Sequence, residues 1–183
     1  MTNGYGIETP ANMIATAQAV LSLAFRLNAE VISGKINKSL FLQNVSVITG
    51  NTGVQVPANP EATTEDLKSG TFNLIQIAMS ASALTTDEVL SDVFGELSDD
   101  TDTNRVGIRV LVHQLRNAFA HNPWRPRWVV YQKYQKRYPI TLYDGSAFTF
   151  DATALDGDGV MPEQVGGLEF WVKLLQHCER LVS

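Results

Sequence analysis

The segment 113–128 (HQLRNAFAHNPWRPRW) gathers the residue types that act on phosphate esters. Arg116 and His121 enclose four residues, and the first of these is Asn117. Arginine is always cationic and binds phosphate through two parallel hydrogen bonds, whereas imidazole titrates near neutral pH. Cleavage of a phosphodiester by proton transfer uses both kinds of group. Because the residue before a proline is disfavoured in helical geometry, Asn122-Pro123 is expected to end a helix directly after His121.

The apolar residues of 105–121 share one face when they are wound as a helix at about 100° per residue. That face is predicted to lie in the core and comprises Ile108, Leu111, Leu115, Ala118 and Phe119. Asn117 and His121 lie off this face and are neighbours four residues apart. Arg116 and His121 do not share a face of a straight helix, so they reach one phosphate only because arginine is long and His121 is in the last turn. An alternative role for the pair is to bind the last carbonyl groups of the helix.

The charge of the chain is unevenly distributed around this segment. The formal net charge is −5, which by itself argues against a nucleic-acid partner. Residues 103–143, however, contain no Asp or Glu and hold eight of the fourteen basic residues. An acid-free basic segment centred on the motif is typical of local phosphate binding. The alternative is that these basic residues pair with acidic helices elsewhere in the chain.

The Arg-x4-His spacing, with Asn117 directly after Arg116, resembles the Arg-x4–6-His motif of the HEPN superfamily (higher eukaryote and prokaryote nucleotide-binding). Many members of that superfamily are metal-independent ribonucleases. The resemblance implies that a ribose 2′-hydroxyl attacks the adjacent phosphate, leaving a 2′,3′-cyclic phosphate and a 5′-hydroxyl. It implies His121 as general acid or base, Arg116 as the group that stabilises charge on phosphorus, and Asn117 as a positioning residue. It implies no metal and no other cofactor.

Further residues near the motif are candidate substrate contacts, namely His113, Arg109, Arg125 and Arg127. His113 is also a second candidate proton carrier, although the family motif does not require it. Two roles stay open for Trp124 and Trp128. They either stack on unpaired bases or cover the edge of the core where the helix meets the next segment.

Length and composition indicate one ordinary globular domain. A chain of 183 residues with 44% hydrophobic residues can bury a core without covalent cross-links. Cys178 is the single cysteine, so no internal disulfide is possible and a reduced cytoplasmic setting is expected. We expect no signal peptide, because no basic region precedes an apolar run at the N-terminus. No apolar run approaches the roughly 20 residues of a membrane span, so no membrane partner is expected.

Helical patterns dominate the first two thirds of the chain. Thr9-Pro10 predicts the start of a helix that ends near Gly34, and its apolar residues cover more than half of the circumference. The expected elements that follow are a helix or strand within 36–48, a loop over 49–63 and a helix from 64 to 84 that is capped by Thr63 or Thr64. Thr86-Asp87-Glu88 is expected to start a short helix that ends at Gly95, and the acidic connection over 98–104 is expected to cap the motif helix.

Strand patterns appear after Pro123, at 128–131, 140–143 and 147–150, with Asp144-Gly145 as a hairpin signal between the last two. Residues 156–159 look superficially like a calcium loop, but the other ligand positions are missing and a plain turn is favoured. A final helix is expected from 165 to 182, with His177 on its surface.

The predicted fold is therefore mainly α, an up-and-down bundle of four to five helices with a small β-hairpin before the last helix. We expect a single HEPN-like domain over 1–183, with a helical core at 10–122, a hairpin region at 124–150 and the last helix at 165–182.

Two functions fit these patterns. The first is an RNA-cleaving enzyme, such as a toxin with a cognate antitoxin protein or an antiviral effector. The second is a catalytically silent module that binds a nucleotide, RNA or a partner protein. HEPN proteins commonly dimerise with their motif helices facing each other, and the broad apolar surface of residues 10–33 fits a homodimer.

Overall fold

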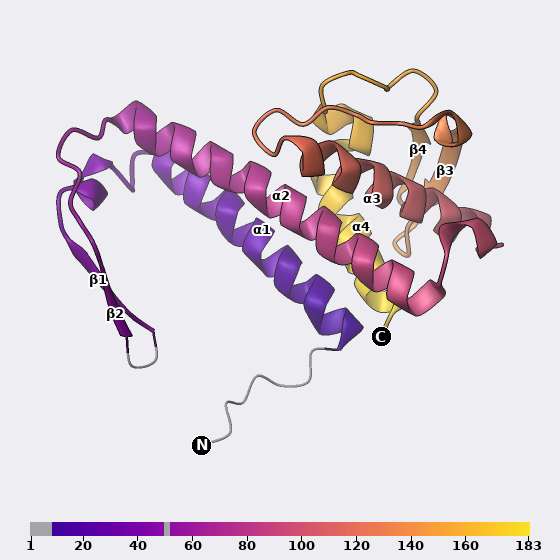
Figure 1. Ribbon diagram of the computed structural model, residues 1–183, viewed down its shortest axis with the longest axis horizontal. Coiled ribbons are helices and arrows are strands. Elements are labelled where there is room, and N and C mark those ends of the chain that lie inside the picture. Colours follow the sequence, from indigo (N-terminus) through magenta and orange to yellow (C-terminus); the bar gives the residue numbers. More distant parts are fainter. Residues whose placement is uncertain (1–8, 50–51) are drawn as a thin grey trace. The chain divides into compact units, whose positions relative to one another are not determined.

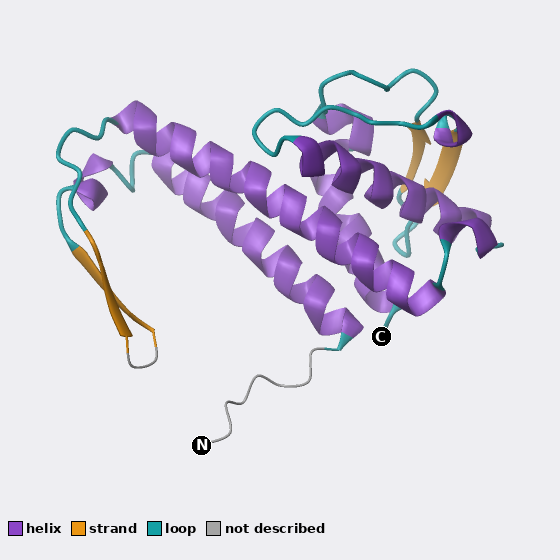
Figure 2. Ribbon diagram, in the orientation of Figure 1, coloured by secondary structure: helices purple, strands orange, loops and turns teal. Residues whose placement is uncertain are grey.

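Four α-helices and two antiparallel hairpins make up the fold in the computed structural model, which describes residues 9–49 and 52–183 (Figure 1, Figure 2). The elements are α1 (Pro10–Ile32), β1 (Val45–Thr49), β2 (Thr52–Val56), α2 (Thr64–Phe94), α3 (Thr103–His121), β3 (Arg137–Thr141), β4 (Ala147–Asp151) and α4 (Gly167–Leu181). Short 3-10 helices lie at Lys38–Phe41, Leu97–Asp99, Gln132–Tyr134 and Pro162–Val165.

The chain divides into two compact units. One unit comprises the described residues 9–21 together with 76–183, and the other comprises Ser22–Ile75. The first unit contains α3, α4 and the β3–β4 hairpin, so every residue of the predicted motif belongs to it.

In the first unit, α3 carries the β3–β4 hairpin on its first turns. The side chain of Asn104 bonds to both backbone groups of Thr141, donating from Nδ2 to the carbonyl oxygen (2.9 Å) and accepting the amide at Oδ1 (2.7 Å). One turn further on, a Cβ added at Gly107 would lie 3.0 Å from the carbonyl oxygen of Pro139 and 3.2 Å from Cγ1 of Ile140. Glycine at 107 therefore allows the strand to approach the helix closely.

The core of the first unit lies between α3 and the faces of α2 and α4. Ile108, Leu111 and Leu115 of α3 are completely buried. From α4, Trp171 is also buried, and its Nε1 donates to Ser82 Oγ of α2 (3.2 Å). The core face predicted for 105–121 is thus the buried face of α3, and the phase of the helix about its axis is fixed.

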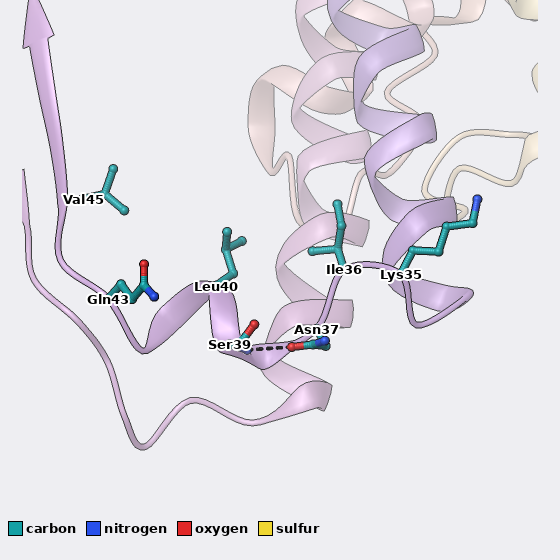
Figure 3. A pocket seen from close by; sticks show the side chains of 7 residues that line it. All are labelled: Lys35, Ile36, Asn37, Ser39, Leu40, Gln43 and Val45. Carbon is teal, nitrogen blue, oxygen red and sulfur yellow. Dashed lines mark hydrogen bonds between the residues drawn. The ribbon is translucent and has the colours of Figure 1, made fainter.

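In the second unit, the β1–β2 hairpin joins the two helical segments and buries none of its own described side chains. Val45 pairs with Val56 and Val47 with Val54, so four valines share one exposed face. A shallow hollow lies at the start of the hairpin (Figure 3), where Asn37 Oδ1 accepts from the Ser39 amide (2.9 Å).

The sequence predicted the structure of residues 36–63 only in part. The undecided stretch 36–48 contains both a 3-10 helix and the first strand. The loop expected over 49–63 is wrong in part, because Thr52–Val56 forms β2; its residues 50 and 51 lie outside the described residues. The Gly, Asn and Pro residues around β2 favour a loop, and the alternation of Val54 and Val56 is too short to indicate a strand by itself. The strand forms because it pairs with β1.

The predicted break of α2 between residues 84 and 86 is also wrong, since the helix is continuous from Thr64 to Phe94. Ala83, Thr86 and Leu90 are all buried, so the packed face continues through the expected restart. Tertiary packing outweighs the capping tendency of Thr86-Asp87. The predicted cap at the other end is confirmed, because Thr63 Oγ1 accepts from the Asp66 amide (3.1 Å).

After α3, the strand expected at 128–131 is absent from the described elements. The amide of Trp128 donates to the Asp158 carbonyl (2.9 Å), and the amide of Val130 donates to the Asp156 carboxylate (2.9 Å). The expected turn at 156–159 thus holds this segment through irregular bonds instead of a ladder. The last helix begins after a 3-10 turn and spans Gly167–Leu181, close to the predicted 165–182.

The hairpin predicted at 140–143 and 147–150 is confirmed, with Ile140 opposite Phe148 and Gly145 in the left-handed conformation (φ 82°) that its turn requires. Its first strand is Arg137–Thr141, so this strand begins and ends earlier in the chain than predicted. The mainly α fold with four helices and a hairpin before the last is likewise confirmed. None of the helices in the described part of the chain combines the length and the apolar composition needed to span a bilayer.

The two mid-helix glycines allow a matched test of the approach of β3 to α3. Gly70→Ala, where a Cβ meets open space, should raise the free energy of unfolding by about 0.5–1 kcal/mol through reduced backbone entropy. Gly107→Val should lower it by about 1–3 kcal/mol, because the added atoms overlap β3. Urea denaturation followed by circular dichroism measures both. An increase at Gly107 would contradict the described contact.

Candidate functional site

The second half of α3 presents the motif because both ends of the helix are fixed. At the start, Asp102 accepts from the amides of Asn104 and Arg105 (3.0 Å each), which is the expected N-cap. At the end, Asn122 has extended backbone (φ −158°, ψ 99°), so the helix stops at His121 as predicted. The buried face then turns the motif residues away from the core.

Arg116 and Asn117 form a bonded pair beside an acidic residue from α2. Arg116 Nη1 donates to Asn117 Oδ1 (2.9 Å), and Arg116 Nε lies 3.9 Å from Asp87 Oδ2. Asn117 therefore positions the guanidinium in this structure, and its side-chain oxygen is not directed to His121. Asp87 holds the same guanidinium from the other side, so the arginine is restrained before any ligand arrives.

His113, one turn before Arg116, shares the same carboxylate. Its Nδ1 lies 3.2 Å from Asp87 Oδ2 and 3.3 Å from Oδ1. The ring of Tyr134 lies 6.0 Å from the imidazole ring, centroid to centroid, and is tilted by 55°. Asp87 thus links two cationic or titratable groups of α3 into one cluster with an aromatic neighbour.

His121 is exposed at the last residue of α3, apart from that cluster. Between Arg116 and His121 the helix rises by about 7.5 Å and turns by roughly 140°. The segment that follows is ordered by Asn122, whose Oδ1 accepts from the amides of Trp124 (3.0 Å) and Arg125 (3.1 Å). This turn brings an exposed indole and an exposed guanidinium to the same helix end as His121.

Arg109 occupies a structural position. Only 3% of the residue is exposed; Nη1 donates to Asp100 Oδ2 (3.0 Å), and Nη2 donates to the carbonyl oxygen of Gly95. Arg105 binds the same carboxylate through Nε and Nη2 (2.8 Å each). Its Cζ lies over the ring of Phe94, 4.5 Å from the ring centre. The two guanidinium groups hold the pKa of Asp100 at about 2, with the hydrogen bonds from Arg105 as the largest cause.

The eight basic residues of 103–143 divide into two groups. Arg105, Arg109, Arg116 and Arg137 have acidic partners outside the segment, which is the alternative that the charge pattern left open. Arg125, Arg127, Lys133 and Lys136 have no acidic partner among the described residues. Arg127 donates to the Gly157 carbonyl (3.0 Å) and remains exposed. The free positive charge of the segment therefore lies after α3.

The two tryptophans have different roles. Trp128 is 1% exposed; its Nε1 donates to Gln164 Oε1 (2.8 Å), and its ring contacts Phe150 at 5.6 Å between centroids. Trp128 therefore covers the core, which is one of the two roles that the sequence left open. Trp124 is 52% exposed, and its indole ring is accessible to a ligand.

The sequence did not predict the roles that three residues of this region have in the site: Asp87, Asn122 and Tyr134. Asp87 was assigned to a helix start, and no local pattern shows that it faces α3. Asn122 was recognised as the end of the helix, and its Asn-Pro context is a signal for the turn that it orders. His177, expected on the surface, is half-buried and accepts the Tyr143 amide at Nδ1 (2.9 Å); burial is the largest cause of its lowered pKa.

The hollow at the start of the β1–β2 hairpin offers no comparable chemistry. The hollow in the second unit is lined by Lys35, whose Nζ is bound to Glu30, and otherwise by amide, hydroxyl and aliphatic side chains (Figure 3). It has no group that transfers protons near neutral pH.

Comparison with known proteins gives no matching family model, no matching curated protein and no matching solved structure.

Asp100 offers a test of the network that holds Arg109. Asp100→Asn leaves a buried guanidinium without its counter-charge and should cost about 3–5 kcal/mol of unfolding free energy at pH 7. Because the native pKa lies below the usual value of 3.8, the carboxylate stabilises the fold above about pH 4 and loses this effect as the pH falls towards 2. Urea denaturation at pH 7 and pH 3 measures both effects.

The neighbouring Asp99→Asn is the matched control. Asp99 is exposed, and its carboxylate accepts only a hydroxyl from Ser98 (3.1 Å). This change should alter stability by no more than about 0.5 kcal/mol. Equal effects of the two substitutions would refute the assigned role of Asp100.

Proposed function

We propose that this chain is a metal-independent endoribonuclease of the HEPN type that acts on single-stranded RNA in the cytoplasm, as a toxin or an antiviral effector. The observation that carries the proposal is the arrangement of the motif at the end of α3. Arg116 is held between Asn117 and Asp87, and His121 is exposed at the last residue of the helix.

The proposed reaction uses these groups in separate roles. The 2′-oxygen forms a bond to phosphorus while the bond from phosphorus to the 5′-oxygen breaks. His121 transfers one proton, either from the 2′-hydroxyl or to the leaving 5′-oxygen, and solvent water takes up or supplies the other. Arg116 stabilises the negative charge that develops on the phosphate oxygens, and Asn117 fixes the direction of its guanidinium. Arg125 and Arg127 would bind flanking phosphates, and Trp124 would stack on an unpaired base.

The separation of Arg116 from His121 around the helix favours a site completed by a second subunit. We therefore include a homodimer in the proposal, with the ends of α3 near the two-fold axis. Val20, Leu23 and Ile32 of α1 are 47%, 65% and 66% exposed, which leaves apolar surface for a partner.

A second candidate function has an observation in its favour. Asp87 lies close to Arg116 and partly neutralises it, so the carboxylate competes with an incoming phosphate. A catalytically silent module that binds a nucleotide, RNA or a partner protein would tolerate this competition better than an enzyme would.

Cleavage of RNA in EDTA separates the two functions. The wild-type protein should cut a single-stranded RNA and leave 2′,3′-cyclic phosphate ends, while DNA of the same sequence, which lacks the 2′-hydroxyl, should survive. Arg116→Ala and His121→Ala should each slow cleavage by at least about a hundredfold. Arg116→Lys should restore only part of the rate, because lysine keeps the charge and loses the paired hydrogen bonds.

Lys38→Ala is the matched control, since Lys38 is an exposed cation in the 3-10 helix Lys38–Phe41, outside the motif, its flanking basic residues and α1. It should leave the rate unchanged. Cleavage that persists in His121→Ala, or that requires Mg²⁺, would refute the mechanism. RNA binding without any cleavage would support the silent module.

Light scattering tests the dimer. At micromolar concentration the mass should be about 40 kDa, twice the 20.1 kDa of one chain. Mixing Arg116→Ala with His121→Ala chains should regain part of the activity if one subunit supplies the arginine and the other the histidine. A monomer that retains full cleavage activity would show that one chain completes the site alone.

A further inference from the structure

A pocket of about 400 Å³ lies beside the motif, between the end of α2 and the middle of α3. Its volume is within the range of about 300–1,000 Å³ that small-molecule sites occupy. Its lining includes Asp87, Asp92, Glu96, Arg109, His113 and Tyr134. We call it the α2–α3 pocket.

The pocket combines fixed groups with flat rings. Arg109 is buried and held by Asp100 and the Gly95 carbonyl, so its position does not depend on a ligand. His113 is held by Asp87, and the ring of Tyr134 lies near the imidazole. Lys133 Nζ lies 4.8 Å from the centre of the Tyr134 ring. Two aromatic side chains thus border a preformed cavity.

The charges of the lining argue for a ligand rich in hydrogen-bond donors. The carboxylates of Asp92 and Glu96 form no ion pair in the part of the chain that the structure describes. They would repel a phosphate. Within the same residues, no three acidic, histidine or cysteine side chains converge as a metal site would require. Acceptors that are spread around a cavity with aromatic walls fit a planar ligand with several N–H groups better than an ion.

We propose that the α2–α3 pocket binds a guanine base of the RNA, next to the phosphate that Arg116 engages. This inference rests on the proposed ribonuclease function. Guanine presents N1–H and the N2 amino group side by side, and a carboxylate of Asp92 or Glu96 accepts from both. Adenine presents an acceptor at N1, which a carboxylate repels. Arg109 lines the same pocket, but its Nη1 and Nη2 donate to Asp100 and to the Gly95 carbonyl, so the preference for guanine is assigned to the carboxylates.

The spacing along α3 agrees with a base site in the α2–α3 pocket and a phosphate site at Arg116. His113 precedes Arg116 by about 4.5 Å along the helix axis, so one nucleotide can present its base to the pocket and its phosphate to Arg116. His113 and His121 are separated by about 12 Å along the same axis. Within one chain they do not act on one phosphate, and His113 is therefore assigned to the base pocket instead of to proton transfer.

Mononucleotide binding by the wild-type protein tests the proposal without interference from cleavage, because a mononucleotide has no phosphodiester bond to a second nucleotide. In calorimetric titrations, GMP should bind at least about fivefold more tightly than AMP, CMP or UMP, the lower limit for one well-placed pair of hydrogen bonds. Asp92→Asn combined with Glu96→Gln should abolish that preference; both residues are exposed, so the fold should persist. Glu88→Gln, an exposed acid of α2 outside the pocket lining, is the control and should retain it.

The aromatic wall is tested separately. Tyr134→Ala should weaken binding of every nucleotide by at least about fivefold through lost stacking, whereas Tyr134→Phe should bind as the parent does. Equal affinity for GMP and AMP, or an unchanged preference in the double variant, would overturn the guanine pocket. Mapping of the wild-type cleavage products then separates the two proposals. Cleavage without preference for guanine refutes the pocket alone, and guanine-selective binding without cleavage refutes the ribonuclease alone.

Discussion

The carboxylate of Asp100 holds together the corner on which the rest of the site depends. It binds Arg105 and Arg109 at once, and Arg109 also binds the carbonyl of Gly95 just after α2. The end of α2, the connection and the first turns of α3 are therefore fixed as one piece. Because α3 is held there and its apolar face is buried, the direction of every later side chain on α3 is set. Arg116 and His113 meet Asp87 as a result of that phase.

This network also explains how an acidic protein can carry an acid-free basic segment. The segment receives its counter-charges from outside: Asp87 and Asp100 come from the preceding helix and connection, and Asp151 comes from β4. What remains unpaired among the described residues is concentrated after α3, near Arg125 and Arg127. A count of charge along the sequence centred the basic segment on the motif and so overstated the positive charge at α3; the basic residues without an acidic partner lie after the helix.

The features that the sequence predicted well are those determined by local chemistry. The caps at Thr63 and Asp102, the stop at Asn122-Pro123 and the turn at Asp144-Gly145 each depend on a few adjacent residues. The core face of α3 follows from periodicity. The features that were missed depend on distant residues. The helix α2 continues through Thr86 because this part of its surface is packed in the core. Asp87 contacts His113 and Arg116 only when α2 and α3 are packed side by side. The amides of Trp128 and Val130 bind Asp158 and Asp156, which lie 30 and 26 residues later in the sequence, so no local pattern distinguishes this segment from a strand.

The contact between the β3–β4 turn and the last helix has a consequence for how the protein responds to acid. The amide of Tyr143 donates to His177 Nδ1, and the Arg180 guanidinium lies 3.7 Å from the centre of the Tyr143 ring. Only the neutral imidazole accepts that bond, and burial together with the nearby Arg180 lowers the pKa of His177. The bond therefore stabilises the fold above the ordinary histidine pKa of about 6.5 and is lost as the pH falls through the lower native value. Mild acidification removes this bond while Asp100 remains ionised, so the contact between the hairpin turn and α4 loosens first and then depends on the Lys173–Asp144 ion pair (3.4 Å) and on the bond from the Tyr143 hydroxyl to Gln176 (3.2 Å).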